Sequence, residues 1–162
     1  MNATSIDGTT ALYYASLEGH SEIVRRLLSC GAFVGRKRSG RTPLFVASKN
    51  SHFEVVCLLL EHGASVDEVD DRGITAFFAA CYRRKLEIAE KLLEYGANVN
   101  CLDVSGRTPL MIAAMFGAKD VVEFLLLKGA DCRLVALNGM NAYDFASIKG
   151  YADVALLLKH DS

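Results

Sequence analysis

A glycine recurs along this chain at a nearly constant spacing, and no other feature limits the fold as strongly. Its copies lie 33 residues apart, except for a first interval of 32: Gly8, Gly40, Gly73, Gly106 and Gly139. A Gly-Ala pair follows each of the first four by 23 residues: Gly31-Ala32, Gly63-Ala64, Gly96-Ala97 and Gly129-Ala130. Two marks in the same phase predict five tandem copies of one unit rather than a single globular core.

Each unit has the sequence of two short helices. In the fourth unit, Thr108 can cap a helix through its hydroxyl, and Pro109 occupies the first helical position, where its missing N–H costs nothing. This helix is expected to end before Gly117. The second helix carries apolar pairs on one face and is expected to end at Gly-Ala, where glycine can adopt the left-handed conformation. The segments between units are expected to form protruding hairpins, with extended stretches such as residues 98–101.

The two helices of a unit cannot bury their apolar faces alone, so neighbouring units are expected to stack side by side. Small residues recur at one position of the first helix and predict close stacking: Ala15, Ala47, Ala80, Ala113 and Ala146. The first unit is as apolar as an internal one, with Leu12, Ile23, Val24, Leu27 and Leu28. Because a terminal repeat normally has a polar outer face, we expect this end to contact a partner or further repeats of a longer array.

The chain resembles ankyrin-repeat proteins in its period and in a Thr-Pro-Leu motif that opens the first helix. The motif is complete at Thr42-Pro43-Leu44 and Thr108-Pro109-Leu110, and looser at Thr10-Ala11-Leu12, Thr75-Ala76-Phe77 and Asn141-Ala142-Tyr143. Where the family usually has histidine after the leucine, this chain has Tyr13, Phe45, Phe78, Met111 and Asp144. The resemblance implies an all-α ankyrin-repeat solenoid of helix-turn-helix units with β-hairpin-like connections. It also implies one domain over residues 1–162, with about five repeats near 5–36, 37–69, 70–102, 103–135 and 136–162.

Composition argues against several functional classes. The net charge of −1 provides no overall attraction to nucleic acid or to an anionic membrane, and no stretch is apolar enough to span a bilayer. The polar N-terminus is not typical of a signal peptide. The cysteines are odd in number and lack the spacing of a disulfide framework or a zinc site: Cys30, Cys57, Cys81, Cys101 and Cys132. We therefore expect an intracellular protein in the cytoplasm, with the nucleus as the alternative.

No residues of the sequence converge on a catalytic arrangement. The histidines are isolated and are interpreted as structural: His20, His52, His62 and His160. No phosphate-binding glycine motif is present, so the glycines are interpreted as punctuation between repeats. We predict a non-catalytic protein without a cofactor or a metal ligand.

The family resemblance implies a groove that binds a protein or peptide segment. In ankyrin-repeat proteins this groove is lined by hairpin residues beside the motif glycine and by the ends of the first helices. The matching positions here are Arg72, Ile74, Tyr82, Arg83, Leu102, Val104, Arg107, Met115, Phe116, Met140 and Ile148. Tyrosine, methionine, phenylalanine and arginine are enriched at protein interfaces. The alternative is a structural spacer within a longer ankyrin array, with scattered surface residues and no ligand of its own.

Charged hairpins and one asparagine complete the candidate sites. A secondary basic hairpin comprises Arg36, Lys37, Arg38, Arg41 and Lys49. The next hairpin is acidic, with Asp67, Glu68, Asp70 and Asp71. Because the two fields are expected to cancel in part, a continuous nucleic-acid track is not expected, and the basic run is interpreted as a solvated hairpin. The family resemblance also implies Asn100 as a candidate for asparaginyl hydroxylation, because ankyrin hairpins undergo this modification.

Overall fold

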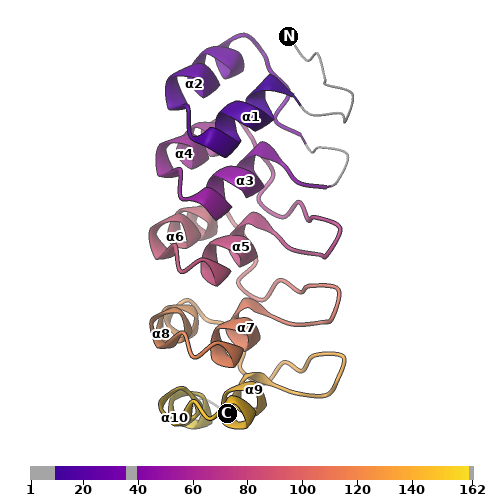
Figure 1. Ribbon diagram of the computed structural model, residues 1–162, viewed down its shortest axis with the longest axis vertical. Helices are drawn as coiled ribbons and strands as arrows, with labels where there is room; N and C mark the ends of the chain where they lie inside the picture. Colours follow the sequence, from indigo (N-terminus) through magenta and orange to yellow (C-terminus); the bar gives the residue numbers. More distant parts are fainter. Residues whose placement is uncertain (1–9, 36–39, 161–162) are drawn as a thin grey trace. The chain divides into compact units, whose positions relative to one another are not determined.

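A computed structural model describes residues 10–35 and 40–160, and these residues form ten α-helices without a β-strand (Figure 1). The helices form consecutive pairs: α1 (Ala11–Glu18) and α2 (Ser21–Ser29), α3 (Pro43–Asn50) and α4 (Phe53–Glu61), α5 (Ala76–Tyr82) and α6 (Leu86–Glu94), α7 (Pro109–Met115) and α8 (Lys119–Leu127), and α9 (Ala142–Lys149) and α10 (Ala152–His160). The all-α, helix-turn-helix prediction is confirmed.

The chain divides into two compact units, which are named here unit 1 (Met1–Ala97) and unit 2 (Asn98–Ser162). Unit 1 contains α1 to α6, and unit 2 contains α7 to α10. The division falls directly after a Gly-Ala pair, so it interrupts no helix pair, although it lies within the predicted repeat 70–102. A single ankyrin-repeat domain over residues 1–162 stays a prediction.

A capping side chain fixes the start of every first helix. Four threonines each accept a hydrogen bond at 3.0–3.2 Å from the backbone N–H three residues later: Thr10, Thr42, Thr75 and Thr108. In the last pair Asn141 takes this role, and the Asp144 carboxylate accepts the Asn141 backbone N–H at 3.0 Å. The predicted cap at Thr108 and the helix end before Gly117 are both confirmed. Reciprocal capping explains why this repeat has an aspartate, Asp144, at the position where the other repeats have Tyr13, Phe45, Phe78 and Met111.

Backbone with positive φ ends the helices. The glycine of each Gly-Ala pair has a positive φ and follows the second helix, as predicted. Two residues that are not glycine, Ser51 and Arg84, have φ values of 71° and 58° directly after or near the ends of α3 and α5. A side chain in this conformation costs free energy, so stacking of the flanking helices must hold these two turns in place.

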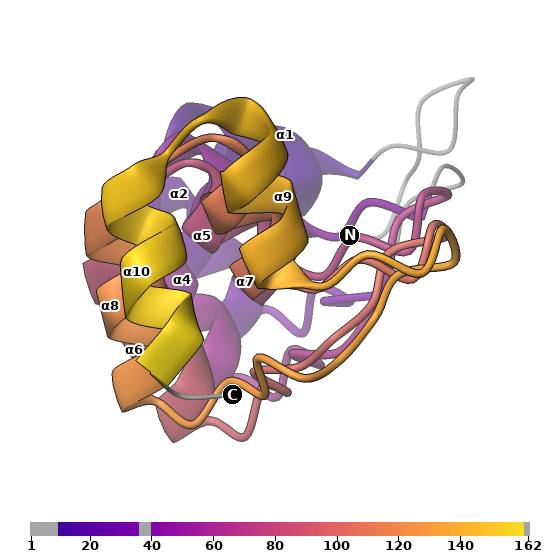
Figure 2. The ribbon, with the colours of Figure 1, turned by 90° about the horizontal axis from the view of Figure 1, so that it is seen from below.

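Helices of the same kind stack within each unit (Figure 2). In unit 1, α3 packs between α1 and α5, and α4 packs between α2 and α6. In unit 2, α7 packs on α9, and α8 packs on α10. The predicted row of alanines is buried throughout, and Ala47, Ala80 and Ala146 have no exposed surface. Small side chains at these positions let the helix axes approach closely, which confirms the stacking prediction.

Short turns close the connections between helix pairs, and they differ in one place from expectation. In unit 1 the Asp70 backbone N–H donates to the Ile74 carbonyl at 3.0 Å. In unit 2 the equivalent bonds join Asp103 to Arg107 at 3.0 Å and Ala136 to Met140 at 2.9 Å. Residues 98–101 are not extended, because the Cys101 N–H donates to the Asn98 carbonyl and the Asn100 N–H donates to the Asn98 side chain. Asparagine side chains favour such turns.

Candidate functional site

The predicted partner-binding residues fall on two surfaces, one in each unit. The unit-1 face comprises residues of the hairpin before α5 and of the ends of α3 and α5, with the loop before α3: Arg41, Lys49, Arg72, Ile74, Tyr82 and Arg83. The unit-2 face comprises hairpin residues and the ends of α7 and α9: Leu102, Val104, Arg107, Met115, Phe116, Met140 and Ile148. Their role in binding stays a prediction.

On the unit-1 face, an exposed aromatic residue stands beside a supporting aliphatic one. Tyr82 is the last residue of α5 and is 54% exposed. Ile74 is half-buried and packs with Leu17 against a buried cluster formed by Tyr13, Phe45, Val46 and Ala79. Ile74 therefore holds the hairpin onto the helices, whereas about half of the Tyr82 surface is exposed to solvent.

A buried carboxylate organises the charges of the unit-1 face. The Asp70 side chain is 2% exposed, and its Oδ1 accepts the backbone N–H groups of Arg72 at 2.9 Å and of Ile74 at 3.1 Å. Its Oδ2 lies 3.8 Å from Arg41 Nε and 3.7 Å from Arg72 Nε. Two arginines from successive repeats thus share one carboxylate. Asp70, expected on an exposed acidic hairpin, instead lies inside the turn because its oxygen closes the hairpin backbone.

Lys49 lies within the electrostatic reach of these groups. Burial lowers the pKa of its ammonium from the usual value, and the positive charges of Arg41, Arg83 and Arg72 lower that pKa further. The Asp70 carboxylate acts in the opposite sense but has the smallest of these influences. Positive charges therefore outweigh negative charges around Lys49. Arg41 and Lys49, which were predicted on the basic hairpin, thus belong to the same surface as Arg72 and Arg83, which were predicted in the groove. Arg36, Lys37 and Arg38 lie outside the described residues.

The unit-2 face is apolar and hollowed. Val104 and Phe116 are 65% and 55% exposed, Leu102 and Ile148 are also exposed, and Met115 is half-buried. A surface hollow of about 460 Å³ opens beside the hairpins and is lined by Val104, Ser105, Arg107, Ala136, Leu137, Asn138 and Phe145. Of these, only Val104 and Arg107 are among the site residues predicted above. Ala136 and Phe145 were missed because residues with core-type chemistry give no sequence signal when they line a hollow, and Ser105 and Asn138 because polar residues are common in turns.

Arg107 is tied to its own hairpin. Its Nη2 and Nε lie 2.7 Å and 2.8 Å from Asp103 Oδ2, which gives a bidentate ion pair. Asp103 Oδ1 accepts the backbone N–H groups of Ser105 and Arg107, both at 2.9 Å. The Asp103 side chain is 3% exposed, so this carboxylate is fully committed to closing the turn.

We expect the Asp103→Asn substitution to lower the free energy of unfolding by about 1–2 kcal/mol, because an amide keeps one acceptor but loses the charge that binds Arg107. Urea denaturation measures the change. The matched control is Asp131→Asn, which removes a carboxylate from an exposed pair with Arg133 and should leave the urea midpoint unchanged. Equal shifts in both variants would contradict the structural role of Asp103.

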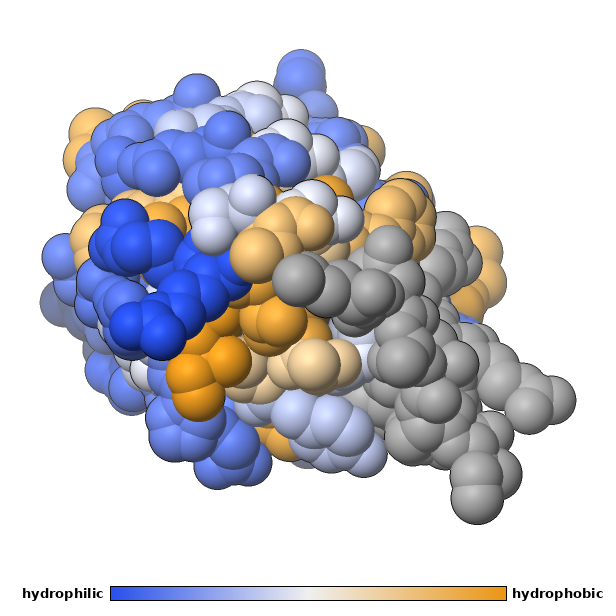
Figure 3. Space-filling model, turned by 90° about the horizontal axis from the view of Figure 1, so that it is seen from above, coloured by the Kyte–Doolittle hydropathy of each residue, from blue (hydrophilic) through white to orange (hydrophobic). Residues whose placement is uncertain are grey.

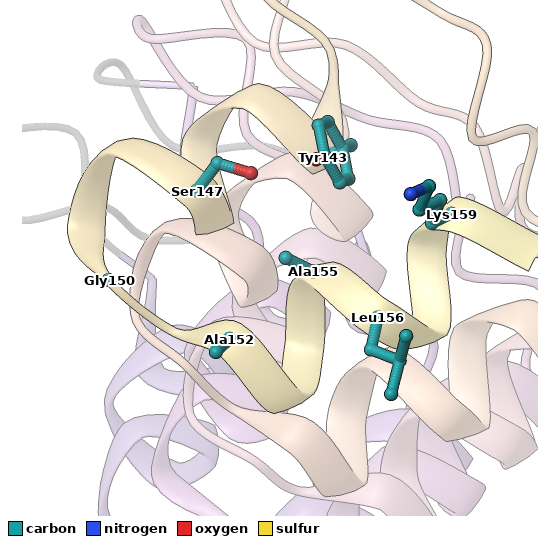
Figure 4. Close-up of a pocket in the computed structure, with 7 residues that line it drawn as sticks. All are labelled: Tyr143, Ser147, Gly150, Ala152, Ala155, Leu156 and Lys159. Atoms are coloured by element: carbon teal, nitrogen blue, oxygen red, sulfur yellow. The ribbon is translucent and has the colours of Figure 1, made fainter.

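The two ends of the helix stacks also expose apolar surface. At the first pair, Tyr14 and Ile23 are half exposed, and Figure 3 shows apolar surface there between hydrophilic regions. On the outer side of α9 and α10, a hollow of about 320 Å³ is lined by Tyr143, Ser147, Gly150, Ala152, Ala155, Leu156 and Lys159 (Figure 4). Figure 4 shows Ala155 beside α9, with Tyr143 and Lys159 at one end of the hollow. Of the residues that line this hollow, only Tyr143 and Lys159 carry a titratable side chain.

The remaining candidates hold local structure. His52 Nε2 lies 3.0 Å from the Leu17 carbonyl and His62 Nδ1 lies 2.8 Å from the Leu58 carbonyl. His20 directly precedes α2, and the side chain of His160 lies outside the described part of the chain. Within residues 10–35 and 40–160, no group of His, Cys, Asp or Glu side chains could hold a metal ion.

Asn100, the candidate hydroxylation site, joins two segments of unit 2. Its Oδ1 accepts the Asp131 backbone N–H at 2.9 Å, and the residue is half-buried. The side chain therefore ties the start of one interhelical segment to the start of the next. Its modification stays a prediction.

Comparison with family models agrees with this architecture. A model described as ankyrin repeats (3 copies) matches residues 1–70 and 63–136. The chain therefore belongs to the ankyrin-repeat family. The matched segments overlap and do not fix the number of repeats, whereas the described helices form the consecutive pairs given above. A comparison with curated proteins gave no match.

Proposed function

We propose that this chain is a non-catalytic protein-interaction module that binds a protein or peptide segment through its hairpins and the ends of its first helices. Ankyrin repeats generally mediate contacts between proteins. The observation that carries the proposal concerns one equivalent position among the last two residues of the first helix. Its chemistry differs from repeat to repeat, whereas the alanine position of the core stays small and buried. That position reads Leu17, Lys49, Tyr82, Met115 and Ile148.

This variation has a physical meaning. Stacking requires similar side chains in every repeat, as the buried alanine row shows, so a position that stacking does not constrain is available for recognition. Tyr82 and Ile148 occupy that position and are exposed, and Phe116 directly follows it. Large aromatic residues at such places are typical anchors of protein interfaces.

The proposal also concerns the cellular compartment of the protein and the class of its partner. The five cysteines are free in the structure, which favours a reducing compartment and hence the cytoplasm or the nucleus. No helix among the described residues has the length and apolar character to cross a bilayer. The proposed module has no cofactor, and its partner is a polypeptide rather than nucleic acid.

A second candidate function is a structural spacer that contacts further ankyrin repeats end to end. Ile23 favours it, because this residue is 50% exposed while its equivalents in the other repeats are at most 3% exposed: Val55, Ile88, Val121 and Val154. At Val55, Ile88 and Val154 the helix that carries this position packs on the second helix of the preceding pair in the same unit. A spacer of this kind would need neither the unit-1 face nor the unit-2 face.

Substitutions on the two faces distinguish these functions. Peptides can be selected on the folded protein from a random displayed library, and their affinities measured by fluorescence anisotropy. We expect Tyr82→Ala or Phe116→Ala to weaken a selected peptide about tenfold or more, because each removes an exposed aromatic anchor. The thermal melt should change little, since both side chains are exposed.

The control is Leu127→Ala, which removes an exposed apolar side chain from the end of α8 and belongs to neither face as defined above. It should leave the affinity unchanged. Selected peptides whose binding is insensitive to both aromatic substitutions would refute the proposed surfaces and favour the spacer.

A further inference from the structure

The unit-1 face concentrates positive charge from two successive repeats. Arg41 precedes α3, Lys49 lies in the last turn of α3, Arg72 belongs to the next hairpin, and Arg83 caps the C-terminus of α5. The Asp70 carboxylate pairs with Arg41 and Arg72 and has a minor influence on Lys49. These five side chains together carry a net charge of +3, while Asp67 and Asp71 lie exposed in the same interhelical segment as Arg72.

The single carboxylate is also poorly placed to neutralise them. Its Oδ1 is occupied by two backbone N–H groups, and its Oδ2 lies 3.7–3.8 Å from the two arginine Nε atoms, which is beyond a strong hydrogen bond. The equivalent carboxylate in unit 2, Asp103, binds one arginine, Arg107, at 2.7 Å and 2.8 Å. Asp70 therefore holds its two arginines less closely than Asp103 holds Arg107.

The other two cations differ from Arg41 and Arg72 in the part of the chain that the structure describes. Neither Lys49 nor Arg83 forms an ion pair there. The lowered pKa of Lys49 reflects the same imbalance, since burial and three arginines each disfavour its charged form. An incoming anion would relieve this repulsion, so binding an anion is favourable at this place in particular.

We propose that the unit-1 face binds an acidic peptide segment, whose carboxylates pair with Arg41, Lys49, Arg72 and Arg83 while an apolar residue of the segment packs on Tyr82. This inference rests on the proposed interaction function and names the chemistry of the partner. Arginine forms bidentate hydrogen bonds with carboxylates, and complementary charge of this kind sets both specificity and association rate.

The arrangement fits several separated carboxylates better than a nucleic acid. Asp67 and Asp71 are exposed in the same interhelical segment as Arg72, so a continuous polyphosphate that followed the hairpins would meet negative charge. The chain as a whole has a net charge of −1, which gives no long-range attraction to nucleic acid. The four cations also come from separate helix ends and loops rather than from one point, as a single phosphate group would require.

Fluorescence anisotropy with defined probes tests the proposal on the full chain. The first probe is a labelled peptide of about 12 residues in which glutamate alternates with leucine and tyrosine, and the second has glutamine in place of every glutamate. We expect the acidic peptide to bind about tenfold or more tightly than its glutamine counterpart. Raising NaCl from about 0.05 M to about 0.5 M should abolish most of this preference, because salt screens exposed charges.

Charge-removing variants locate the site. The double variant Lys49→Gln with Arg83→Gln should weaken binding of the acidic peptide about tenfold, because it removes the two cations of this face that form no ion pair among the described residues. The matched control, Arg25→Gln with Arg26→Gln, removes the same charge from exposed residues of α2 in the same unit and should change the affinity less than about twofold. Circular dichroism confirms that both variants remain folded.

The outcomes separate this inference from the proposed function. Equal binding of the acidic and glutamine peptides, or equal losses in the two double variants, would overturn the acidic-segment proposal. Tighter binding of a single-stranded oligonucleotide or of a phosphoserine peptide than of the acidic peptide would also overturn it. Library-selected peptides that need Tyr82 but contain no acidic residues would leave the interaction function intact and remove only the charge-based inference.

Discussion

The Phe77→Ala variant should lose about 3–5 kcal/mol of unfolding free energy, because it removes a large side chain from a fully enclosed position. Phe77 is in α5, which packs on both α3 and α6, and none of its surface is exposed. Alanine would leave a cavity that the rigid helix stack on both sides cannot close. Urea denaturation followed by circular dichroism measures the loss.

Leu127→Ala is the control for this measurement. Leu127 is 82% exposed, so its truncation should change the free energy of unfolding by no more than about 0.5 kcal/mol. If Phe77→Ala were as mild as Leu127→Ala, the layered core of unit 1 described above would be wrong.

The second large effect is expected at Gly40, where the Gly40→Ala variant should lose about 2–4 kcal/mol. Gly40 has a φ of 75°, and a Cβ added there would lie 2.9 Å from the Val69 carbonyl oxygen and 3.0 Å from Asp70 Cα. Because both neighbours are backbone atoms, the hairpin would have to move to make room. The glycine is thus required twice, by its conformation and by the close approach of the next hairpin.

Gly63→Ala isolates the first of these requirements, the conformation. Gly63 has a φ of 78°, but nothing lies within 4 Å of a Cβ built there. Its substitution should therefore cost only the conformational strain of about 1–2 kcal/mol. Urea midpoints measured side by side give the difference, and equal losses in the two variants would show that the contact between hairpins contributes nothing.

The periodic part of the fold could be predicted from the sequence because stacking imposes the same demand on every repeat. The threonine caps, the buried alanine row and the positive φ at Gly-Ala all follow from repeated local chemistry. Ser51 and Arg84 could not be predicted, because neither residue type indicates a left-handed backbone. Their conformation depends on the stacked helices around them.

The candidate surfaces were predictable only in outline. Family resemblance located Tyr82 and Phe116 at helix ends, and both are exposed. It could not show that Asp70 is buried, because the sequence presents this residue as one of a run of acidic groups. The turn in which its Oδ1 accepts two backbone N–H groups depends on backbone geometry. Its ion pair with Arg41 joins residues that are 29 positions apart. The pattern of charged residues along a sequence therefore does not show which charged side chains are exposed.

Helices in each unit touch only their partner and the helices of adjacent pairs. The separation along the chain between contacting residues therefore stays near one repeat, however many copies are joined. Folding rates fall as contacts become more distant in sequence, so gene duplication can lengthen such a protein without slowing its assembly. Architectures with pairing between distant segments lack this freedom, since each insertion there increases the entropy lost on closing the loop.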